Sequence, residues 1–218
     1  MYLAIVNLRA ATGKTTTAVH LAEALAETGR TLLVDSDLRL CALSWAERSG
    51  QFGFQVLGLP TRDIHRRLPE IARDFTHVVI DSPPGDFGVV ASSVLAAERV
   101  VVPTSPSLED LSALRPTLDL IRQIGTLSRT QVSILLSRVT DDSRRARAER
   151  GLRRFGEADL MDAQVPLLER SGPSAGLLGS ASAFGPVADE LLGVDELSLG
   201  AHLVRRAPAV SARFSRSR

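Results

Sequence analysis

Four consecutive residues, Gly13-Lys14-Thr15-Thr16, carry the clearest chemical signal in this sequence. They stand where the apolar run 3–6 gives way to a helical pattern, and Lys14 is the only lysine in the chain. Backbone amides at a helix start can cradle phosphate, an ammonium beside them can reach the outer phosphates of a nucleotide, and the Thr15 hydroxyl can ligate Mg²⁺. Because every other strong cation is Arg, the single ammonium indicates a site that Arg cannot serve. The alternative is an ordinary turn with a solvated lysine.

Acidic residues end two of the expected buried strands. Residues 31–34 lead into Asp35-Ser36-Asp37, and residues 77–80 lead into Asp81, which Ser82-Pro83-Pro84-Gly85 follows. Ligands of open α/β sheets bind at the carboxyl ends of the strands, so these carboxylates are expected near the phosphate loop. The alternatives are a helix amino cap for the first group and a plain proline turn for the second.

The rest of the chain alternates between strand and helix patterns. Apolar runs predict strands at 3–6, 31–34, 54–57, 77–80, 100–102, 132–136 and 163–165. Helical periodicity predicts helices at 14–28, with Gly29 just past the helix end, and at 108–124. Continuous apolar strands between helices are typical of a parallel sheet covered on both faces. The predicted fold class is therefore α/β: a three-layer sandwich whose mostly parallel, twisted sheet has helices on both faces.

Composition narrows the setting of the protein. A hydrophobic share of 44% over 218 residues is enough for the core of one domain. The single cysteine, Cys41, excludes an internal disulfide and indicates a reducing, cytoplasmic interior. No apolar run approaches the roughly 20 residues that span a bilayer, so no membrane partner is expected. We expect one domain over residues 1–193 and a mobile tail rich in Arg, Ser and Ala over residues 194–218.

The stretch from Arg9 to Thr16 resembles the deviant Walker A box of ParA-type ATPases, whose usual form is KGGxGKTT. Arg9 occupies the position of the family's signature lysine, and the resemblance implies that it reaches the phosphates bound by a partner protomer. Ala10 and Ala11 replace two glycines; if either position needs a positive φ, alanine costs on the order of 1 kcal/mol. The resemblance implies nucleotide binding by Arg9, Ala10, Ala11, Thr12, Gly13, Lys14, Thr15 and Thr16, and by Arg138 near the adenine.

The first acidic group is similar to the switch I sequence of the same family, commonly DxDPQ. That match implies that Asp37 orients or polarises the attacking water, while Asp35 supports Mg²⁺ or the loop. Leu38 and Arg39 stand where the family usually has Pro-Gln. The catalytic set implied by the resemblance is Lys14, Asp37 and Arg9.

Residues 78–85 are similar to the family's Walker B and switch II pattern. The match implies that Asp81 holds Mg²⁺ through a coordinated water, and that Gly85 can turn an amide toward the γ phosphate. The implied metal set is Thr15, Asp81 and Asp35. Residues 101–111 resemble a family segment that packs near the nucleotide and the dimer interface, although prolines after a buried strand are also simple loop punctuation.

The resemblance spans about residues 1–192 and most nearly suggests the short ParA and ParF-type relatives that lack an amino-terminal helix-turn-helix domain. It implies an ATP- and Mg²⁺-dependent homodimer that binds nonspecific DNA at the nucleoid. A ParB-like centromere-binding partner would stimulate slow hydrolysis, and plasmid or chromosomal cargo would be positioned. Two alternatives stay open: a nucleotide-dependent switch with little hydrolysis, and a membrane-site positioning ATPase resembling MinD.

Residues 138–154 contain a local excess of arginine within a chain of net charge +1. At helical spacing Ala148, Leu152 and Phe155 share a face that can pack inward. The opposite face carries the predicted DNA-binding residues Arg144, Arg147, Arg150 and Arg154. Dimerisation would double this basic face and strengthen contacts with DNA phosphates. The alternative is a solvated surface in a composition that favours arginine.

Overall fold

The computed structural model describes residues 1–49, 52–125, 130–152, 158–168 and 181–193. Its centre is a seven-stranded sheet of order β3-β2-β4-β1-β5-β6-β7, in which every strand pair is parallel. The strands are β1 (Tyr2–Ile5), β2 (Thr31–Asp35), β3 (Gln55–Gly58), β4 (His77–Asp81), β5 (Arg99–Thr104), β6 (Gln131–Leu136) and β7 (Asp159–Leu160). β2 and β4 are buried at all five positions, as their continuous apolar runs require.

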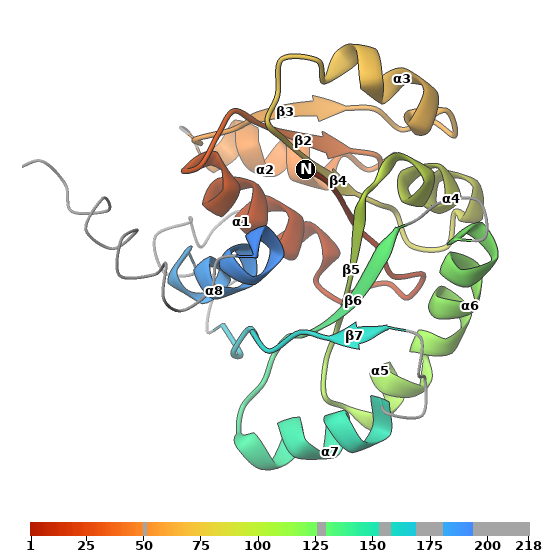
Figure 1. The fold of residues 1–218 in the computed structure, drawn as a ribbon, viewed down its shortest axis with the longest axis vertical. Helices are drawn as coiled ribbons and strands as arrows, with labels where there is room; N and C mark the ends of the chain where they lie inside the picture. Colours follow the sequence, from red (N-terminus) through yellow and green to blue (C-terminus); the bar gives the residue numbers. More distant parts are fainter. Residues whose placement is uncertain (50–51, 126–129, 153–157, 169–180, 194–218) are drawn as a thin grey trace, which may run out of the picture.

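Helices cover both faces of this sheet (Figure 1). One face carries α1 (Lys14–Ala26), α2 (Cys41–Ser49) and α8 (Ala181–Leu192), whose Leu21, Trp45 and Phe184 belong to one core cluster. The other face carries α3 (Ile64–Ile71), α4 (Phe87–Ala96), α5 (Leu108–Ser112), α6 (Leu114–Gly125) and α7 (Asp142–Leu152), which share a second core cluster. The predicted three-layer α/β sandwich is confirmed.

Two predicted helices differ from the structure in their bounds. The segment 108–124 forms two helices, α5 and α6, because Pro116 has no N–H to donate and is tolerated only in the first turn of a new helix. The first helix ends at Ala26, and Gly29 is not its left-handed cap. Gly29 instead lies against Thr76, whose side chain would be 2.7 Å from a Cβ at this position, so close approach explains the glycine.

The seventh strand was predicted at 163–165 but lies at Asp159–Leu160. The reason is a side chain on another element. Glu190 of α8 accepts the amides of Asp162 and Ala163 at 3.1 and 2.7 Å, which turns this part of the backbone away from the sheet. Pairing with the sheet resumes only at Val165, whose amide donates to the Leu136 carbonyl at 2.9 Å.

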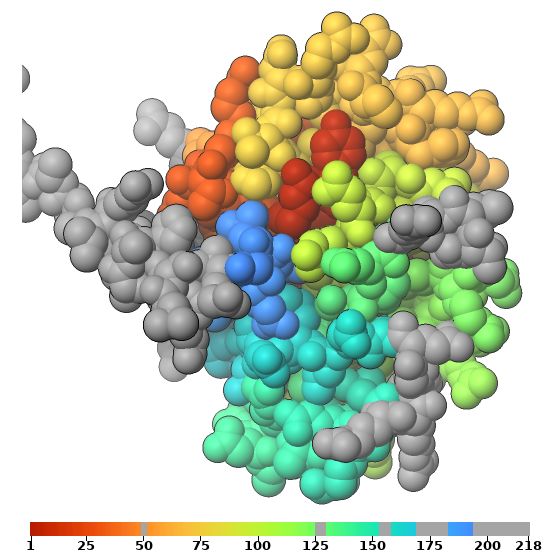
Figure 2. Space-filling model, in the orientation of Figure 1, coloured from red at the N-terminus to blue at the C-terminus, as the bar shows by residue number. Residues whose placement is uncertain are grey.

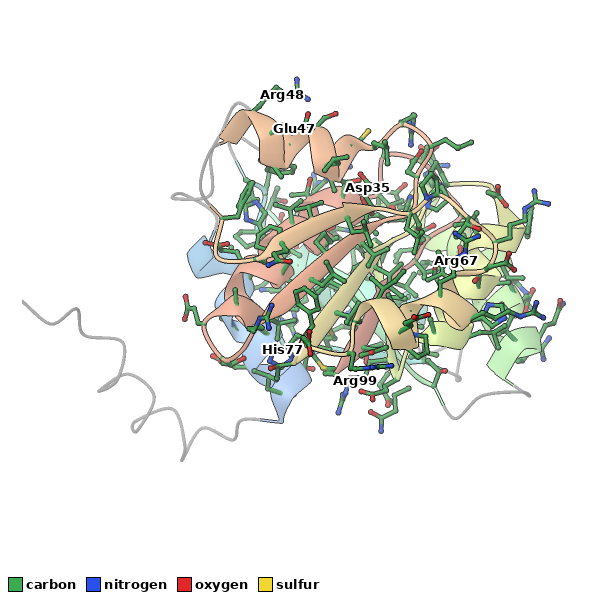
Figure 3. All side chains as sticks on the ribbon, turned by 90° about the horizontal axis from the view of Figure 1, so that it is seen from above. Asp35, Glu47, Arg48, Arg67, His77 and Arg99 are labelled. Carbon is green, nitrogen blue, oxygen red and sulfur yellow. The ribbon has the colours of Figure 1, made fainter. Side chains whose placement is uncertain are left out.

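Because the strands are parallel, their carboxyl ends lie together at one edge of the sheet. Asp35 and Asp81 are register partners at this edge, and His77 marks the opposite end of β4. Figure 3 shows Asp35 and His77 at the two ends of the sheet. The loops that follow β1, β2, β4 and β5 therefore meet where the sequence predicts the phosphate site.

Candidate nucleotide-binding site

Two buried polar side chains anchor the start of the phosphate loop. The Asn7 side-chain amide donates to the Pro103 carbonyl at 3.0 Å, and its Oδ1 accepts the amide of Arg9 at 2.9 Å. The Thr117 hydroxyl, on α6, accepts the amide of Leu8 at 3.1 Å. These contacts fix the loop to β5 and α6. Sequence reasoning missed Asn7 and Thr117, because each acts through a partner about a hundred residues away.

The loop places an alanine where its motif usually has glycine. Ala11 has φ +59° and Gly13, which caps α1, has φ +89°. Ala11, and not Ala10, is thus the substituted position that meets the left-handed region, at a cost of about 1 kcal/mol. Arg138 donates from Nη2 to the Ala11 carbonyl at 2.6 Å, so the predicted adenine-side residue supports this strained turn.

Lys14 is buried at the start of α1, and its ammonium faces the loop. Nζ donates to the Arg9 carbonyl at 2.9 Å. The pKa of Lys14 is lowered to about 8, mainly by burial; the Arg39 charge adds to the decrease, while Asp81 and Asp37 oppose it. An ammonium with so little water around it favours any phosphate oxygen that enters the loop.

Asp81 is buried at the end of β4, and in the described part of the chain no hydrogen-bond donor of good geometry is directed at either of its carboxylate oxygens. The pKa of Asp81 is raised to about 7, mainly by burial; the Asp35 and Asp37 charges add to the rise, and the Thr15 hydroxyl and the Lys14 charge oppose it. Within the described ranges no three His, Cys, Asp or Glu side chains gather as a metal cage. A single carboxylate beside a threonine hydroxyl fits Mg²⁺, which keeps several waters and phosphate oxygens as ligands.

Asp35 has a different environment, although it lies at the same height on the neighbouring strand. Its Oδ2 accepts the amides of Ala42 and Leu43 at 2.8 and 3.0 Å, and its Oδ1 accepts the amide of Asp37 at 3.2 Å. Burial raises the pKa of Asp35, and these three backbone bonds lower it. Of the predicted roles of Asp35, these contacts support holding the loop and capping α2.

Asp37 points toward Arg39 of its own loop. The two side chains form an ion pair of 2.6 Å between Arg39 Nη2 and Asp37 Oδ2. Burial raises the pKa of Asp37, but the side-chain and backbone hydrogen bonds from Arg39 outweigh it and leave the pKa below its ordinary value. The sequence places Arg39 at the Gln position of switch I, but it does not reveal this pairing.

Gly85 and Asp86 shape the loop after β4. Gly85 has φ +75°, a conformation that favours glycine. Asp86 caps α4, because its Oδ1 accepts the amides of Gly88 and Val89 at 3.0 and 3.1 Å. The predicted switch II turn is thus held at its far end by a helix cap.

Arg9 is directed to two acids of α5. Its Nη2 lies 2.5 Å from Glu109 Oε1, and its Nε lies 2.8 Å from Asp110 Oδ1. Ser105 also donates to Asp110, at 2.6 Å. The segment 101–111 therefore packs beside the phosphate loop through a specific ion pair, and Glu109 and Asp110 are site residues that the sequence left without a role.

A hollow beside the phosphate loop has the composition of a base pocket. Gly13, Thr16 and Thr17 form one side, Ser137 and Arg138 another, and Val165, Leu167 and Phe184 supply apolar surface. Apolar walls with a few polar groups are typical of pockets that bind planar rings. Thr12 is buried next to it, and its hydroxyl lies 3.5 Å from the Arg9 carbonyl.

The predicted basic face lies on α7, at the end of the molecule opposite α3 (Figures 1 and 2). Arg144, Arg147 and Arg150 are exposed, whereas Ala148 and Leu152 are buried, as predicted from the helical spacing. Arg145 lies between the two faces and pairs with Glu149 at 2.6 Å. Arg154, Phe155 and the predicted tail 194–218 lie outside the described residues.

Comparison with known proteins assigns the family. Residues 3–173 match the family described as the CobQ/CobB/MinD/ParA nucleotide-binding domain. The chain belongs to this family. The predicted relationship to ParA-like and MinD-like P-loop proteins is thereby confirmed.

Relatives and solved structures agree with this assignment. Maintenance of carboxysome distribution protein A of Gloeobacter kilaueensis is 37% identical over 177 residues, covering 79% of this chain and 73% of that protein. Its namesake from Halothiobacillus neapolitanus is 26% identical over 151 residues, covering 67% and 70%. The fold also matches a Cyanothece McdA complex with ATP, with a TM-score of 0.69, 16% identity, and coverage of 89% of this chain and 96% of that one.

A further structural match bears on the expected ligands. Cobyrinic acid a,c-diamide synthase of Mycobacterium smegmatis, solved with ADP and magnesium, has a TM-score of 0.65 at 22% identity and covers 87% of this chain and 93% of its own. None of the helices in the described ranges has the length and apolarity needed to cross a membrane.

Proposed function

We propose that the protein is a Mg²⁺-dependent ATPase that positions an intracellular cargo by alternating between a free monomer and an ATP-bound dimer. The observation that carries this proposal is Asp81, a buried carboxylate beside Thr15 and Lys14 to which no donor of good geometry is directed within the described residues. Burying an uncompensated carboxylate is costly, and a bound cation would offset that cost. The family assignment supports the nucleotide half of the proposal.

Each residue of the edge has a role in this proposal. Thr15 and Asp81 would hold Mg²⁺, which would offset charge on the outer phosphates. Lys14 exchanges the Arg9 carbonyl for a phosphate oxygen, and the amides of residues 10–16 cradle the phosphates. Arg138 supports the loop next to the base, and Asp35 keeps the switch loop in place.

Self-association is supported by the surface around the site. Leu38, Phe87 and Leu108 lie on or next to the loops at the carboxyl edge and are 81%, 59% and 70% exposed. Large exposed apolar side chains gathered around one site are typical of a contact surface. In the proposed dimer Arg9 leaves Glu109 and Asp110 and neutralises the phosphates of the partner protomer, while Asp37 positions the attacking water.

Nonspecific DNA binding by α7 forms the second part of the proposal. Arg144, Arg147 and Arg150 are exposed on this helix, and Arg154 extends the same face in the sequence. α7 also packs against α5, where Leu111 lies 3.7 Å from a Cβ placed on Gly151. The acids that hold Arg9 are on α5, and α5 contacts α7. A movement of Arg9 away from these acids could therefore shift α7 through α5. Two such helices on one dimer would bind the DNA backbone more strongly than one.

The cargo is proposed from the relatives. The names of the curated relatives refer to carboxysome distribution, which favours a large protein body as the cargo. Positioning over the nucleoid in the cytoplasm with the help of a partner protein is carried over from the sequence resemblance. Plasmid or chromosome segregation with a ParB-like partner is the other cargo class predicted from the sequence. Both cargo classes use the same ATP-dependent dimer, so they share the tests below.

Phosphate release and light scattering test the enzyme. The parent should release phosphate slowly from Mg·ATP and should double its mass with ATP. Asp37→Ala should bind ATP and dimerise without turnover, whereas Arg9→Ala should bind ATP as a monomer. ATP-dependent dimers with no phosphate release from the parent would favour the switch with little hydrolysis, which the Asp37–Arg39 ion pair supports. A parent that binds no ATP would contradict the proposal.

A charge reversal on α7 tests the DNA surface. Arg147→Glu with Arg150→Glu should lower the affinity of the ATP state for a random duplex about tenfold and reduce its salt dependence, with ATP affinity unchanged. The matched control is Arg66→Glu with Arg67→Glu on α3, at the opposite end of the molecule (Figure 1), where both arginines are also exposed. Equal losses in the two variants would indicate a general charge effect and contradict this assignment.

A further inference from the structure

One neighbour, Arg39, occupies both oxygens of the Asp37 carboxylate. Oδ1 accepts the Arg39 backbone amide at 3.0 Å and Nε at 3.2 Å. Oδ2 accepts Nη2 at 2.6 Å and Nε at 3.2 Å. An oxygen that already accepts two donors has little capacity left for a hydrogen bond from a reacting water.

The backbone of the loop brings Arg39 back onto its own acid. The Leu40 amide donates to the Asp37 carbonyl at 3.0 Å, and Leu40 has φ +48°, so residues 37–40 form a tight turn. Within this turn the Asp37 side chain is 12% exposed and the Arg39 side chain is 64% exposed. The carboxylate thus lies on the inner side and the guanidinium on the solvent side.

A groove next to Arg39 gives its guanidinium space to move away from Asp37. Arg39 lies on the wall of a groove of about 420 Å³, which the loops after β2, β3 and β4 enclose with Leu38, Pro60, Arg62 and Pro84. Rotation of the Arg39 side chain into this groove would free Asp37 Oδ2 and would leave Oδ1 with the Arg39 backbone amide alone, without moving the strand end. The Asp37–Arg39 contact is therefore an ion pair that a side-chain rotation can open.

We propose that Arg39 is a positioning residue that withholds Asp37 from the attacking water until its guanidinium turns into the groove. The inference rests on the proposed ATPase function. Arg39 acts through Asp37 and contacts no residue of the phosphate loop through a hydrogen bond in the described part of the chain. Its loss should therefore raise turnover with little change in ATP affinity.

Steady-state kinetics of full-length variants test this role. Arg39→Gln should raise the basal kcat for phosphate release about three- to tenfold, the range expected for opening a partly exposed, bidentate ion pair, with KM for ATP within about twofold of the parent. Arg39→Lys keeps the positive charge but cannot form the bidentate contact, so its basal kcat should lie between those of the parent and Arg39→Gln. The control is Arg48→Gln on α2, an exposed arginine whose side chain bonds only the Ser44 carbonyl among the contacts described, and it should match the parent.

Hydrogen exchange without nucleotide gives a second readout. Residues 37–40 should exchange faster in Arg39→Gln than in the parent, because the bond from the Arg39 amide to Asp37 is then less restrained. A parent that hydrolyses ATP and an Arg39→Gln variant with equal or lower kcat would overturn the inference alone; a raised KM as well would place Arg39 on the phosphates. ATP binding without release by either protein would overturn the ATPase proposal, and this inference with it.

Discussion

Asp35 and Asp81 end adjacent strands, are register partners, and are both buried, yet their surroundings differ completely. Three backbone amides donate to Asp35 at 2.8 to 3.2 Å. Among the residues that the structure describes, no donor of good geometry reaches either oxygen of Asp81. The first carboxylate is satisfied by its own fold, whereas the second is left for a ligand.

This difference separates a structural acid from a candidate metal ligand. Burial raises the pKa of both carboxyls, so burial alone does not distinguish them. What distinguishes them is whether the fold supplies hydrogen bonds to the charged form, because buried charges without such bonds are rare unless they serve a ligand. The comparison therefore predicts opposite outcomes for substitutions at the two positions.

The largest expected effect is on stability at Asp35. Asp35→Ala removes the acceptor of three backbone amides and should lower the free energy of unfolding by about 2–4 kcal/mol, with or without Mg²⁺. Urea denaturation of the nucleotide-free protein measures this. If Asp35→Ala were as stable as the parent and lost only Mg²⁺-dependent ATP binding, the two acids would have to exchange roles.

At Asp81 the effect should appear in ligand binding. Asp81→Asn keeps the shape of the side chain but removes the charge, so the gain in ATP affinity on adding Mg²⁺ should shrink about tenfold. Calorimetric titrations of ATP in Mg²⁺ and in EDTA measure that gain for both proteins. An unchanged gain in the variant would remove Asp81 from the metal site.

A smaller effect concerns pH. A carboxyl whose pKa is about 7 when folded and 3.8 when unfolded binds more protons in the folded state between these values, so its contribution to stability falls as pH rises through them. Burial lowers the pKa of His20 to about 4. The contribution of His20 to stability therefore rises with pH between about 4 and its unfolded pKa of 6.5, opposite to that of Asp81. The informative quantity is therefore the difference in unfolding free energy between Asp81→Asn and the parent.

That difference should grow in favour of Asp81→Asn by on the order of 1–2 kcal/mol from about pH 4 to pH 7 and stay level above. Urea denaturation across this range checks it. A difference that does not depend on pH would mean that Asp81 is already compensated in the nucleotide-free protein.

The sequence predicted those features that local pattern determines. Apolar runs predicted β2 and β4 and placed Asp35 and Asp81 at their ends, and Gly13 and Lys14, at the start of α1, predicted the phosphate loop. It could not predict which acid was satisfied, because two of the three donors to Asp35 come from the helix that follows it. For a related reason the sequence did not predict the roles of Asn7, Thr117 and Glu109. Their hydrogen-bond partners are about a hundred residues away along the chain.

The same limit explains the seventh strand and Arg39. The predicted position of β7 was wrong because Glu190, on the last described helix, accepts hydrogen bonds from two backbone amides just after β7, those of Asp162 and Ala163. The pairing of Arg39 with Asp37 depends on the turn at Leu40. Leu40 has a positive φ, which cannot be predicted from a leucine in the sequence. The fold class was therefore readable from the sequence, while the occupancy of each site oxygen required the three-dimensional contacts.

Calorimetric titration of Mg·ATP into the parent, Lys14→Ala and the control Arg48→Gln tests the nucleotide site most directly. Lys14 is the chain's only lysine, and its ammonium lies in the loop that would hold the phosphates. We expect a dissociation constant of about micromolar order for the parent and Arg48→Gln, and a loss of at least about 100-fold in Lys14→Ala. Parent-like affinity in Lys14→Ala would contradict a phosphate site in this loop.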